Sequence, residues 1–123
     1  MSLLNSVLKV FVGDKSKQDV KAIMPVVNKI KTFEAATAAL SNDALRAKTL
    51  TFKETIKGAC LSIENSIAEL YSEADTSEDI DRKEEIYQEI DSLRDDVYAK
   101  TQEVLETILP EAFSVIKETA RRF

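Results

Sequence analysis

The polar stretch "SEADTSED", residues 72–79, decides the fold predicted for this chain. It is the only polar cluster between two long helical segments that can reverse the chain. Two runs of apolar residues close to heptad spacing flank it, each about 30 residues long. They predict an antiparallel helical hairpin. The run before the cluster is Leu45, Phe52, Ile56, Ala59, Ile63, Ile67 and Leu70, and the run after it is Ile80, Tyr87, Ile90, Val97, Val104 and Ile108, widened by Ile86 and Leu93.

Local signals set the expected ends of the two hairpin helices. Ser41 or Asn42 is expected to cap the first helix, with Asp43 in its first turn, and Ser77 is expected to cap the second. Gly58 weakens the first helix without ending it. Each helix would be about 45 Å long at about 1.5 Å per residue. Because this exceeds a compact domain of this size, their apolar faces need the outer helices or a second copy of the chain, and we expect the isolated chain to dimerise.

Shorter helices are predicted on both sides of the hairpin. Residues 3–12 have an amphipathic pattern, Gly13 is a helix stop, and Ser16 is the expected N-cap of the next helix. That helix carries apolar residues at spacings of three and four, with a kink or restart expected at Pro25. Pro110 is expected to open a new, last helix. The predicted fold is thus all-α, a long antiparallel hairpin with shorter flanking N- and C-terminal helices. The apolar positions of the two outer helices are Val20, Ile23, Met24, Val27, Ile30 and Phe33, and then Ala112, Phe113, Val115, Ile116 and Ala120.

The composition excludes most kinds of catalytic site. The 123 residues suffice for one domain, and they include no histidine, one cysteine and two glycines. Catalytic Ser-His-Asp and Cys-His pairs, cysteine-histidine zinc sites and Gly-rich phosphate loops are therefore excluded. Cys60 lies on the apolar face and is expected to be core. We assign no catalytic, cofactor-binding or metal-ligating residue, and we predict that the chain is not an enzyme.

Charge is distributed unevenly along the chain. Residues 1–57 carry ten Lys and Arg against five Asp and Glu, whereas residues 58–123 carry seven against seventeen. A basic N-terminal part and an acidic C-terminal part argue against one nucleic-acid-binding surface. Residues 73 to 96 include eleven acidic residues and three basic ones. This region is either a solvated helix face and loop or an electrostatic docking patch for a basic partner.

Alternating acidic and hydroxyl side chains at the predicted reversal resemble the start of a calcium-binding loop. The residues are Asp75, Ser77, Asp79 and Asp81. Isoleucine occupies both the position that needs glycine and the position that needs a bidentate glutamate. We therefore expect no calcium site.

The amphipathic N-terminal segment is a candidate contact surface. Leu4, Val7, Leu8 and Phe11 share one side with Lys9 nearby, and further lysines follow at positions 15, 17 and 21. An apolar stripe beside lysines suits a helix lying in a membrane interface. The same pattern suits a helix folded onto the hairpin, and the residues alone leave both alternatives open.

Two stretches of the sequence are distinctive, "NKIKTFEAATAALSNDALRAKTLTFKE" at residues 28–54 and "LPEAFSVIKETARRF" at residues 109–123. They resemble motifs of the SecA family, the ATPase motors of bacterial preprotein translocation. The amphipathic start is also similar. Neither motif is a catalytic signature. The matching positions are Leu40, Ser41, Asp43, Leu45, Ala47, Lys48, Thr49 and Phe52 in the first motif and Leu109, Pro110, Glu111, Ala112 and Phe113 in the second.

The resemblance implies a division of the chain and a role for each part. Residues 1–54 would be the SecA-like N-terminal helices, residues 55–107 an inserted helical hairpin, and residues 108–123 the start of the helix leading into the nucleotide-binding domain. It implies that the chain stops before the ATP site, so that ATP and Mg²⁺ belong to the parent translocase and not to this segment. Phe113, Ile116 and Phe123 would pack on the motor domain.

The resemblance also implies partners and a location. These are the remainder of the SecA motor, the SecYEG channel and an anionic membrane surface, in the cytoplasm and peripheral at the inner membrane. Leu4, Val7, Leu8, Lys9 and Phe11 would make the lipid or channel contact. The alternative is a stand-alone helical-hairpin interaction module with an acidic docking loop. Such a protein would have to bury Phe113, Ile116 and Phe123 internally.

Overall fold

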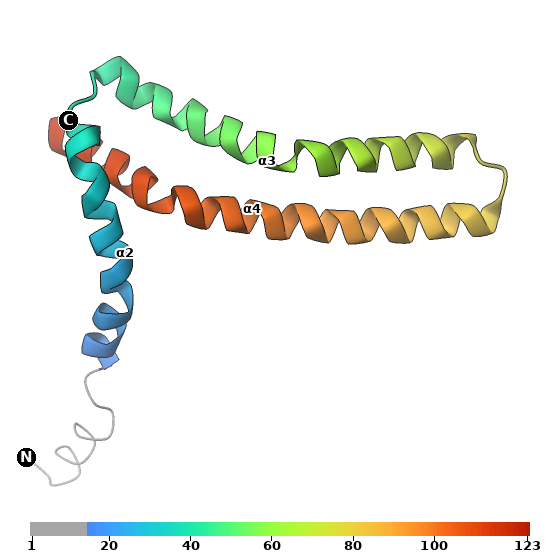
Figure 1. Ribbon diagram of the computed structural model, residues 1–123, viewed down its shortest axis with the longest axis horizontal. Helices are drawn as coiled ribbons and strands as arrows, with labels where there is room; N and C mark the ends of the chain where they lie inside the picture. The colour runs from blue at the N-terminus through green and yellow to red at the C-terminus, as the bar shows by residue number, and fades with distance from the viewer. Residues whose placement is uncertain (1–14) are drawn as a thin grey trace, which may run out of the picture.

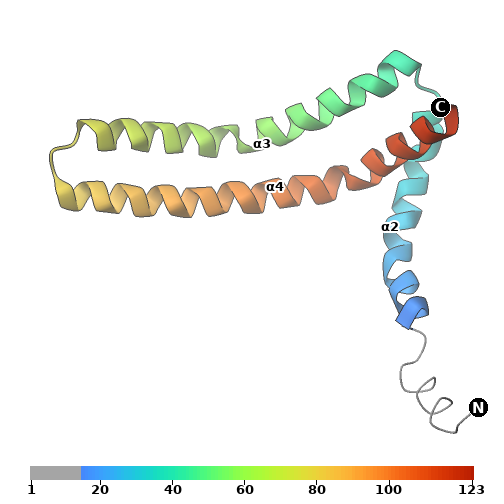
Figure 2. The ribbon, with the colours of Figure 1, turned by 180° about the vertical axis from the view of Figure 1, so that it is seen from behind.

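Three helices make up the fold of the part of the chain that the computed structural model describes, residues 15–123. Helix α2 spans Lys15–Ala38, α3 spans Asn42–Thr76 and α4 spans Ile80–Arg122. Helices α3 and α4 run antiparallel as a long hairpin, and α2 leaves the open end of that hairpin at a steep angle (Figures 1 and 2). The predicted all-α fold with a long antiparallel hairpin is therefore confirmed.

The reversal lies where the polar cluster predicts it, but its caps differ in detail. The loop consists of residues 77–79. Ser77 ends α3 by donating its backbone N–H to the Glu73 carbonyl oxygen. The N-cap of α4 is Asp79 rather than Ser77, because the Asp79 carboxylate accepts from the backbone N–H groups of Asp81 and Arg82. At the other end of α3, the Ser41 hydroxyl accepts from the backbone N–H of Ala44 at 3.1 Å, as the sequence predicts.

Two expectations for the outer helices are wrong, and of the kink or restart expected at Pro25 the restart is absent. Helix α2 continues through Pro25 without a restart, and α4 continues through Pro110, so no separate C-terminal helix begins there. Ser16 lies inside α2 and is not its N-cap. A proline within a helix removes one backbone hydrogen bond. At Pro110 the helix is held on either side of that position by its contacts with α3 and α2, so packing outweighs the local preference.

The hairpin core is thin and lies along one seam. Near the loop, Ile86 is fully buried and Ile90 nearly so, and both pack with Ala74 of α3. Farther along, Cys60 is buried as predicted and its thiol lies 3.4 Å from the Thr101 hydroxyl. All of the apolar positions predicted on α3 are at least partly buried.

Of the positions assigned to the α4 seam, Ile80 lies outside it and Tyr87 lies at its edge, where its ring meets the Tyr71 ring of α3 with 6.4 Å between the ring centroids. Ile80 is 79% exposed and Tyr87 is 48% exposed. The buried residues of α4 near the loop combine Ile90 of the predicted run with Ile86, which the sequence pattern treated as a widening of the seam together with Leu93. The apolar pattern of α4 therefore marks two faces, of which only one is covered by α3.

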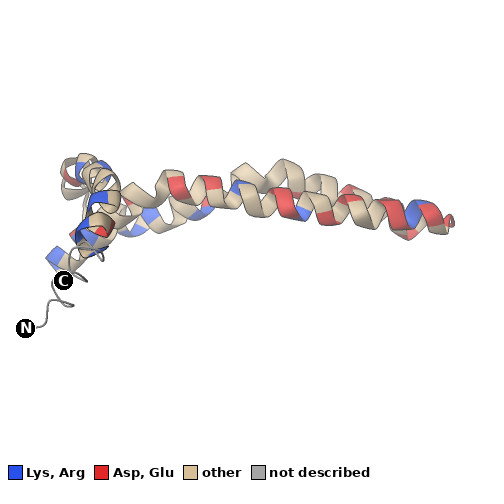
Figure 3. Ribbon diagram, turned by 90° about the horizontal axis from the view of Figure 1, so that it is seen from below, with Lys and Arg blue, Asp and Glu red and all other residues tan. Residues whose placement is uncertain are grey.

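Helix α2 contacts the hairpin only through its second half. Val20, Ile23 and Met24, in its first half, are exposed, while Val27, Ile30 and Phe33 are partly buried. Lysine and arginine are frequent along α2, whereas aspartate and glutamate predominate toward the hairpin loop (Figure 3). Among residues 15–123, no helix combines the length and the hydropathy that a membrane span requires. Residues 1–14 lie outside the described part.

Candidate docking site

The open end of the hairpin is a junction of three helices. The Ser114 hydroxyl of α4 donates to the Thr37 hydroxyl of α2 at 3.0 Å, and both side chains are buried. The Lys48 ammonium of α3 lies 2.6 Å from the Glu111 carboxylate of α4, with both side chains partly buried. The last turns of α4 are therefore attached to α3 on one side and to α2 on another.

Arg122 joins α4 to the turn between α2 and α3. Its guanidinium donates to the carbonyl oxygens of Ala38 and Leu40, at 3.1 and 2.8 Å, and to the Asn42 side-chain oxygen at 2.9 Å. No basic residue lies in the last turn of α2 itself. Arg122 thus supplies the positive charge and the hydrogen bonds that a helix C-terminus favours, although it belongs to another helix.

Glu118 holds two arginines in place at this junction. Its carboxylate accepts from Arg121 at 2.6 and 2.9 Å and from Arg122 at 2.7 Å. These hydrogen bonds and the positive charge of the two guanidinium groups lower the pKa of Glu118 to about 2. The pKa of Arg121 is raised by the same contact. The arrangement keeps Glu118 ionised, and it orients Arg122 toward the α2–α3 turn.

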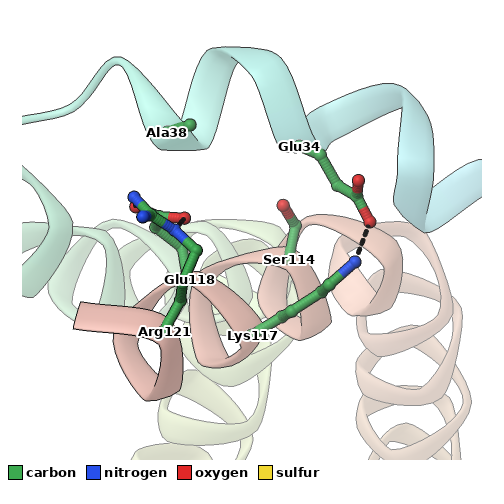
Figure 4. A pocket seen from close by; sticks show the side chains of 6 residues that line it. All are labelled: Glu34, Ala38, Ser114, Lys117, Glu118 and Arg121. Atoms are coloured by element: carbon green, nitrogen blue, oxygen red, sulfur yellow. Dashed lines mark hydrogen bonds and ion pairs between the residues drawn. The ribbon is translucent and has the colours of Figure 1, made fainter. Parts of the chain in front are cut away.

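A cavity of about 320 Å³ opens between α2 and α4 at this junction. Its charged side chains are paired with one another, Lys117 with Glu34 at 2.5 Å and Arg121 with Glu118 (Figure 4). Carboxylates and cations that neutralise each other in this way stabilise the contact between helices and leave no group activated for proton transfer or nucleophilic attack. The cavity therefore has the character of a structural joint. Its lining residues are Glu34, Ala38, Ser114, Lys117, Glu118 and Arg121.

Neither a metal-ligand cluster nor a Gly-rich loop lies among residues 15–123. Residues 15–123 hold no group of His, Cys, Asp and Glu that could bind a metal ion. Gly58 is the only glycine among them, so this part of the chain contains no Gly-rich phosphate loop. Asp79, from the calcium-loop-like pattern, serves as a helix cap.

The far side of the last turns of α4 is apolar and uncovered. Phe113 is 50% exposed, Ile116 is 63% exposed and Phe123 is 79% exposed. Leu105 and Leu109 continue this surface along the same helix and are also exposed. We call these five residues the inner apolar face of α4. In residues 15–123, neither α2 nor α3 covers this face.

The predicted contact residues divide between two parts of the chain. Leu4, Val7, Leu8, Lys9 and Phe11 lie outside the described residues, so their contacts stay a prediction. The exposure of Phe113, Ile116 and Phe123 is the condition that packing on another domain requires, although no such packing is seen here.

The roles of Glu118 and Arg122 were not predicted from the sequence. A carboxylate at i−3 and i−4 from two successive arginines was the available signal.

Comparison with known proteins identifies the chain's relatives. The family model described as the SecA DEAD-like domain matches residues 8–123. Curated proteins named protein translocase subunit SecA match at 56% identity in Christiangramia forsetii and at 50% in Flavobacterium psychrophilum, each over all 123 residues of this chain and 11% of the relative. The same-named protein of Phocaeicola vulgatus is 40% identical over 111 residues, which are 90% of this chain and 10% of the relative.

These matches include the hairpin, because the first two relatives align over the whole chain. The chain spans about a tenth of the length of the curated relatives it matches. No solved structure matches the chain significantly.

Proposed function

The chain belongs to the SecA family of protein translocase subunits, and we propose that it is a scaffold and docking segment of such a translocation motor. In this proposal the segment packs against the ATP-hydrolysing part of SecA through the inner apolar face of α4. ATP and Mg²⁺ act elsewhere in that protein, and this segment contributes position rather than catalysis. The motor works at the cytoplasmic face of the inner membrane.

The observation that carries the proposal is the asymmetry of the last turns of α4. Two sides of the helix are attached by polar contacts, Lys48 to Glu111 toward α3 and Ser114 to Thr37 toward α2. The remaining side presents Phe113 and Ile116 to solvent. A contiguous exposed apolar surface rimmed by polar residues is characteristic of an interface. A stand-alone module would gain stability by burying these side chains, so their exposure supports the docking role over the stand-alone alternative.

The junction also explains how the segment would act as a scaffold. Arg122 and Glu118 tie the α2–α3 turn to α4, and Lys117 pairs with Glu34 of α2. A partner seated on the inner apolar face would therefore meet a helix whose orientation relative to both neighbours is already set. Preorganised surfaces lose less conformational entropy on binding.

The N-terminal segment adds a second contact in this proposal. Leu4, Val7, Leu8, Lys9 and Phe11 would bind an anionic membrane surface or the SecYEG channel, as the resemblance to SecA implies. Helix α2 supports this role, because its first half extends away from the hairpin and carries Lys15, Lys17 and Lys21 (Figure 1). The proposed homodimer also stays a prediction.

Binding between this chain and the rest of a SecA protein tests the docking role. The partner would be the Christiangramia forsetii SecA from which the segment matching this chain has been removed. We expect the fluorescently labelled chain to bind it, and we expect the double variant F113S/I116S to bind about tenfold or more weakly, because about 50 Å² or more of apolar surface is lost at about 25 cal/mol per Å².

The matched control variant is L50S/L61S, which removes two exposed apolar side chains from α3. It should bind as the unmodified chain does. Equal loss of affinity in both variants, or no binding by the unmodified chain, would contradict the docking role.

A further inference from the structure

The outer half of α4 carries a second uncovered surface, separate from the inner apolar face. Ile80, Tyr87 and Tyr98 are all exposed, and Tyr98 is 69% exposed. They are seven and eleven positions apart, spacings that return to the same side of an α-helix. Glu84, Asp91 and Asp95 recur at spacings of seven and four beside them and are also exposed. We call these six residues the outer tyrosine face.

The nearby arginines of α4 do not neutralise the carboxylates of this face. The Arg82 guanidinium forms ion pairs with the carboxylates of Glu73, Glu85 and Glu89, at 2.9 to 3.3 Å. Arg94 lies 3.4 Å from Asp91, a weak exposed pair, and donates to the Tyr71 hydroxyl at 2.5 Å. Within residues 15–123, the side chains of Glu84 and Asp95 make no hydrogen bond or ion pair, so the face keeps surplus negative charge.

Lys83, the third cation nearby, belongs to another side of α4. It lies seven positions before Ile90, on the side of the helix that faces α3, and it is partly buried. It therefore does not lie among the exposed carboxylates.

Helix α2 of the same copy does not cover this face. The outer tyrosine face begins at the loop end of the hairpin, whereas α2 packs at the open end and points away (Figures 1 and 2). A second copy of the chain could lay its basic α2 here in an antiparallel pair, in which the contact would be made twice. Such a pair would appear as a dimer that buries residues 80–98, and it would overturn the choice of a separate partner protein.

We propose that the outer tyrosine face binds an amphipathic helix of a partner protein that carries lysine or arginine beside an apolar stripe. Such a helix would lie along α4, with its apolar stripe on Ile80, Tyr87 and Tyr98. Its cations would meet Glu84, Asp91 and Asp95. Tyrosine suits this role because its ring accepts apolar contact and attracts cations, while its hydroxyl tolerates water.

The dimensions and the charge of the face define the occupant further. Residues 80 to 98 span about 27 Å of helix axis, so a partner helix of about 18 residues would cover the face. The carboxylates repel phosphate groups, which disfavours nucleic acid and anionic lipid at this surface. The occupant is therefore a protein segment. The outer tyrosine face would recognise its partner by charge as well as by apolar contact, whereas the inner apolar face carries no carboxylate among its five residues.

A pair of designed peptides tests the proposal. The probe is an 18-residue amphipathic helix with leucine on one face and lysine on the other, and the control peptide has glutamate in place of each lysine. With the ¹⁵N-labelled 123-residue chain, we expect the lysine peptide to shift the amide resonances of residues 80–98. We expect the glutamate peptide to shift none of them.

Matched variants separate this face from the overall negative charge. The variant E84Q/D91N/D95N removes the three carboxylates of the face, and the control E54Q/E64Q/D96N removes three exposed carboxylates from other sides of the hairpin. In fluorescence anisotropy at about 0.15 M salt, the first variant should bind the lysine peptide with a Kd about tenfold higher than that of the unmodified chain. Each exposed ion pair contributes only a fraction of the binding free energy. The control should bind within about twofold of the unmodified chain.

Several outcomes would overturn the proposal. Equal weakening in both variants would mean that only net charge attracts the peptide. Binding of the glutamate peptide would mean that apolar adhesion is sufficient. Shifts confined to α2 or to Phe113 and Ile116, or no binding up to millimolar peptide, would show that the outer tyrosine face is not a docking surface.

Discussion

Replacing Ile86 by alanine tests whether the two long helices form one packed unit. Ile86 is fully buried between Ala74 and Ile90, so I86A removes buried methylene and methyl groups and leaves a cavity. Substitutions of this kind cost about 3 kcal/mol in well-packed cores. The matched control is I80A, because Ile80 lies one and a half turns away on the same helix and is 79% exposed. Alanine there should cost nothing and gain about 0.4 kcal/mol from helix propensity.

Urea unfolding followed by far-UV circular dichroism measures the difference. With a slope of about 2 kcal/mol per M, I86A should lower the midpoint by about 1.5 M, while I80A should move it by less than about 0.3 M. Amide exchange at the loop end of both helices would show whether this region opens on its own before the rest. Equal midpoint shifts in the two variants would refute the assignment of the seam to Ile86 and Ile90.

Three further predictions follow from the junction and from the N-terminal segment. The lowered pKa of Glu118 contributes stability above its usual value of 4.5 that is lost as the pH falls toward about 2. E118Q should therefore show a smaller drop in urea midpoint between pH 6 and pH 2.5 than the unmodified chain, and an identical drop would contradict the role of this carboxylate. R122Q should speed amide exchange in the last turn of α2, because it weakens the hydrogen bonds to Ala38 and Leu40, while exchange near Ile86 should not change. Deleting residues 2–12 should abolish co-sedimentation with phosphatidylglycerol vesicles, and unchanged sedimentation would end the proposal of a membrane contact there.

The hairpin could be predicted because its signals are local and periodic. Apolar residues at helical spacing on both sides of one polar cluster leave few other arrangements, and Ser41 is a cap whose hydroxyl bonds only three residues away. The loop position followed from the same pattern. The family resemblance, carried by residues 28–54 and 109–123, was likewise visible in the sequence and is confirmed by the family model.

The missed features depend on contacts between distant residues. Pro110 looks like a helix start when read locally, but contacts on both sides of it keep α4 continuous. Ile80 and Tyr87 match a heptad, yet a second apolar face on the same helix produces the same pattern. Arg122 binds carbonyl oxygens 82 and 84 positions away, and main-chain acceptors leave no trace in a sequence.

The candidate site was predicted in part. The sequence placed Phe113, Ile116 and Phe123 on a helix with an apolar stripe, and their exposure appears only when α2 and α3 are seen on the other sides. The outer tyrosine face was predicted only in part, because the acidic region 73–96 was considered as a docking patch for a basic partner while Ile80 and Tyr87 were assigned to the hairpin seam.

Solvent accessibility of α4 inside a complete SecA protein tests the central claim most directly. In the Christiangramia forsetii SecA, the matching segment would be replaced by this chain carrying C60A and either I116C or I80C, and the rate of maleimide labelling would be compared with that of the isolated chain. The docking role predicts that I116C is labelled at least tenfold more slowly in the whole protein, while I80C is labelled equally fast in both. Equal labelling of I116C in the whole protein and in the isolated chain would contradict it.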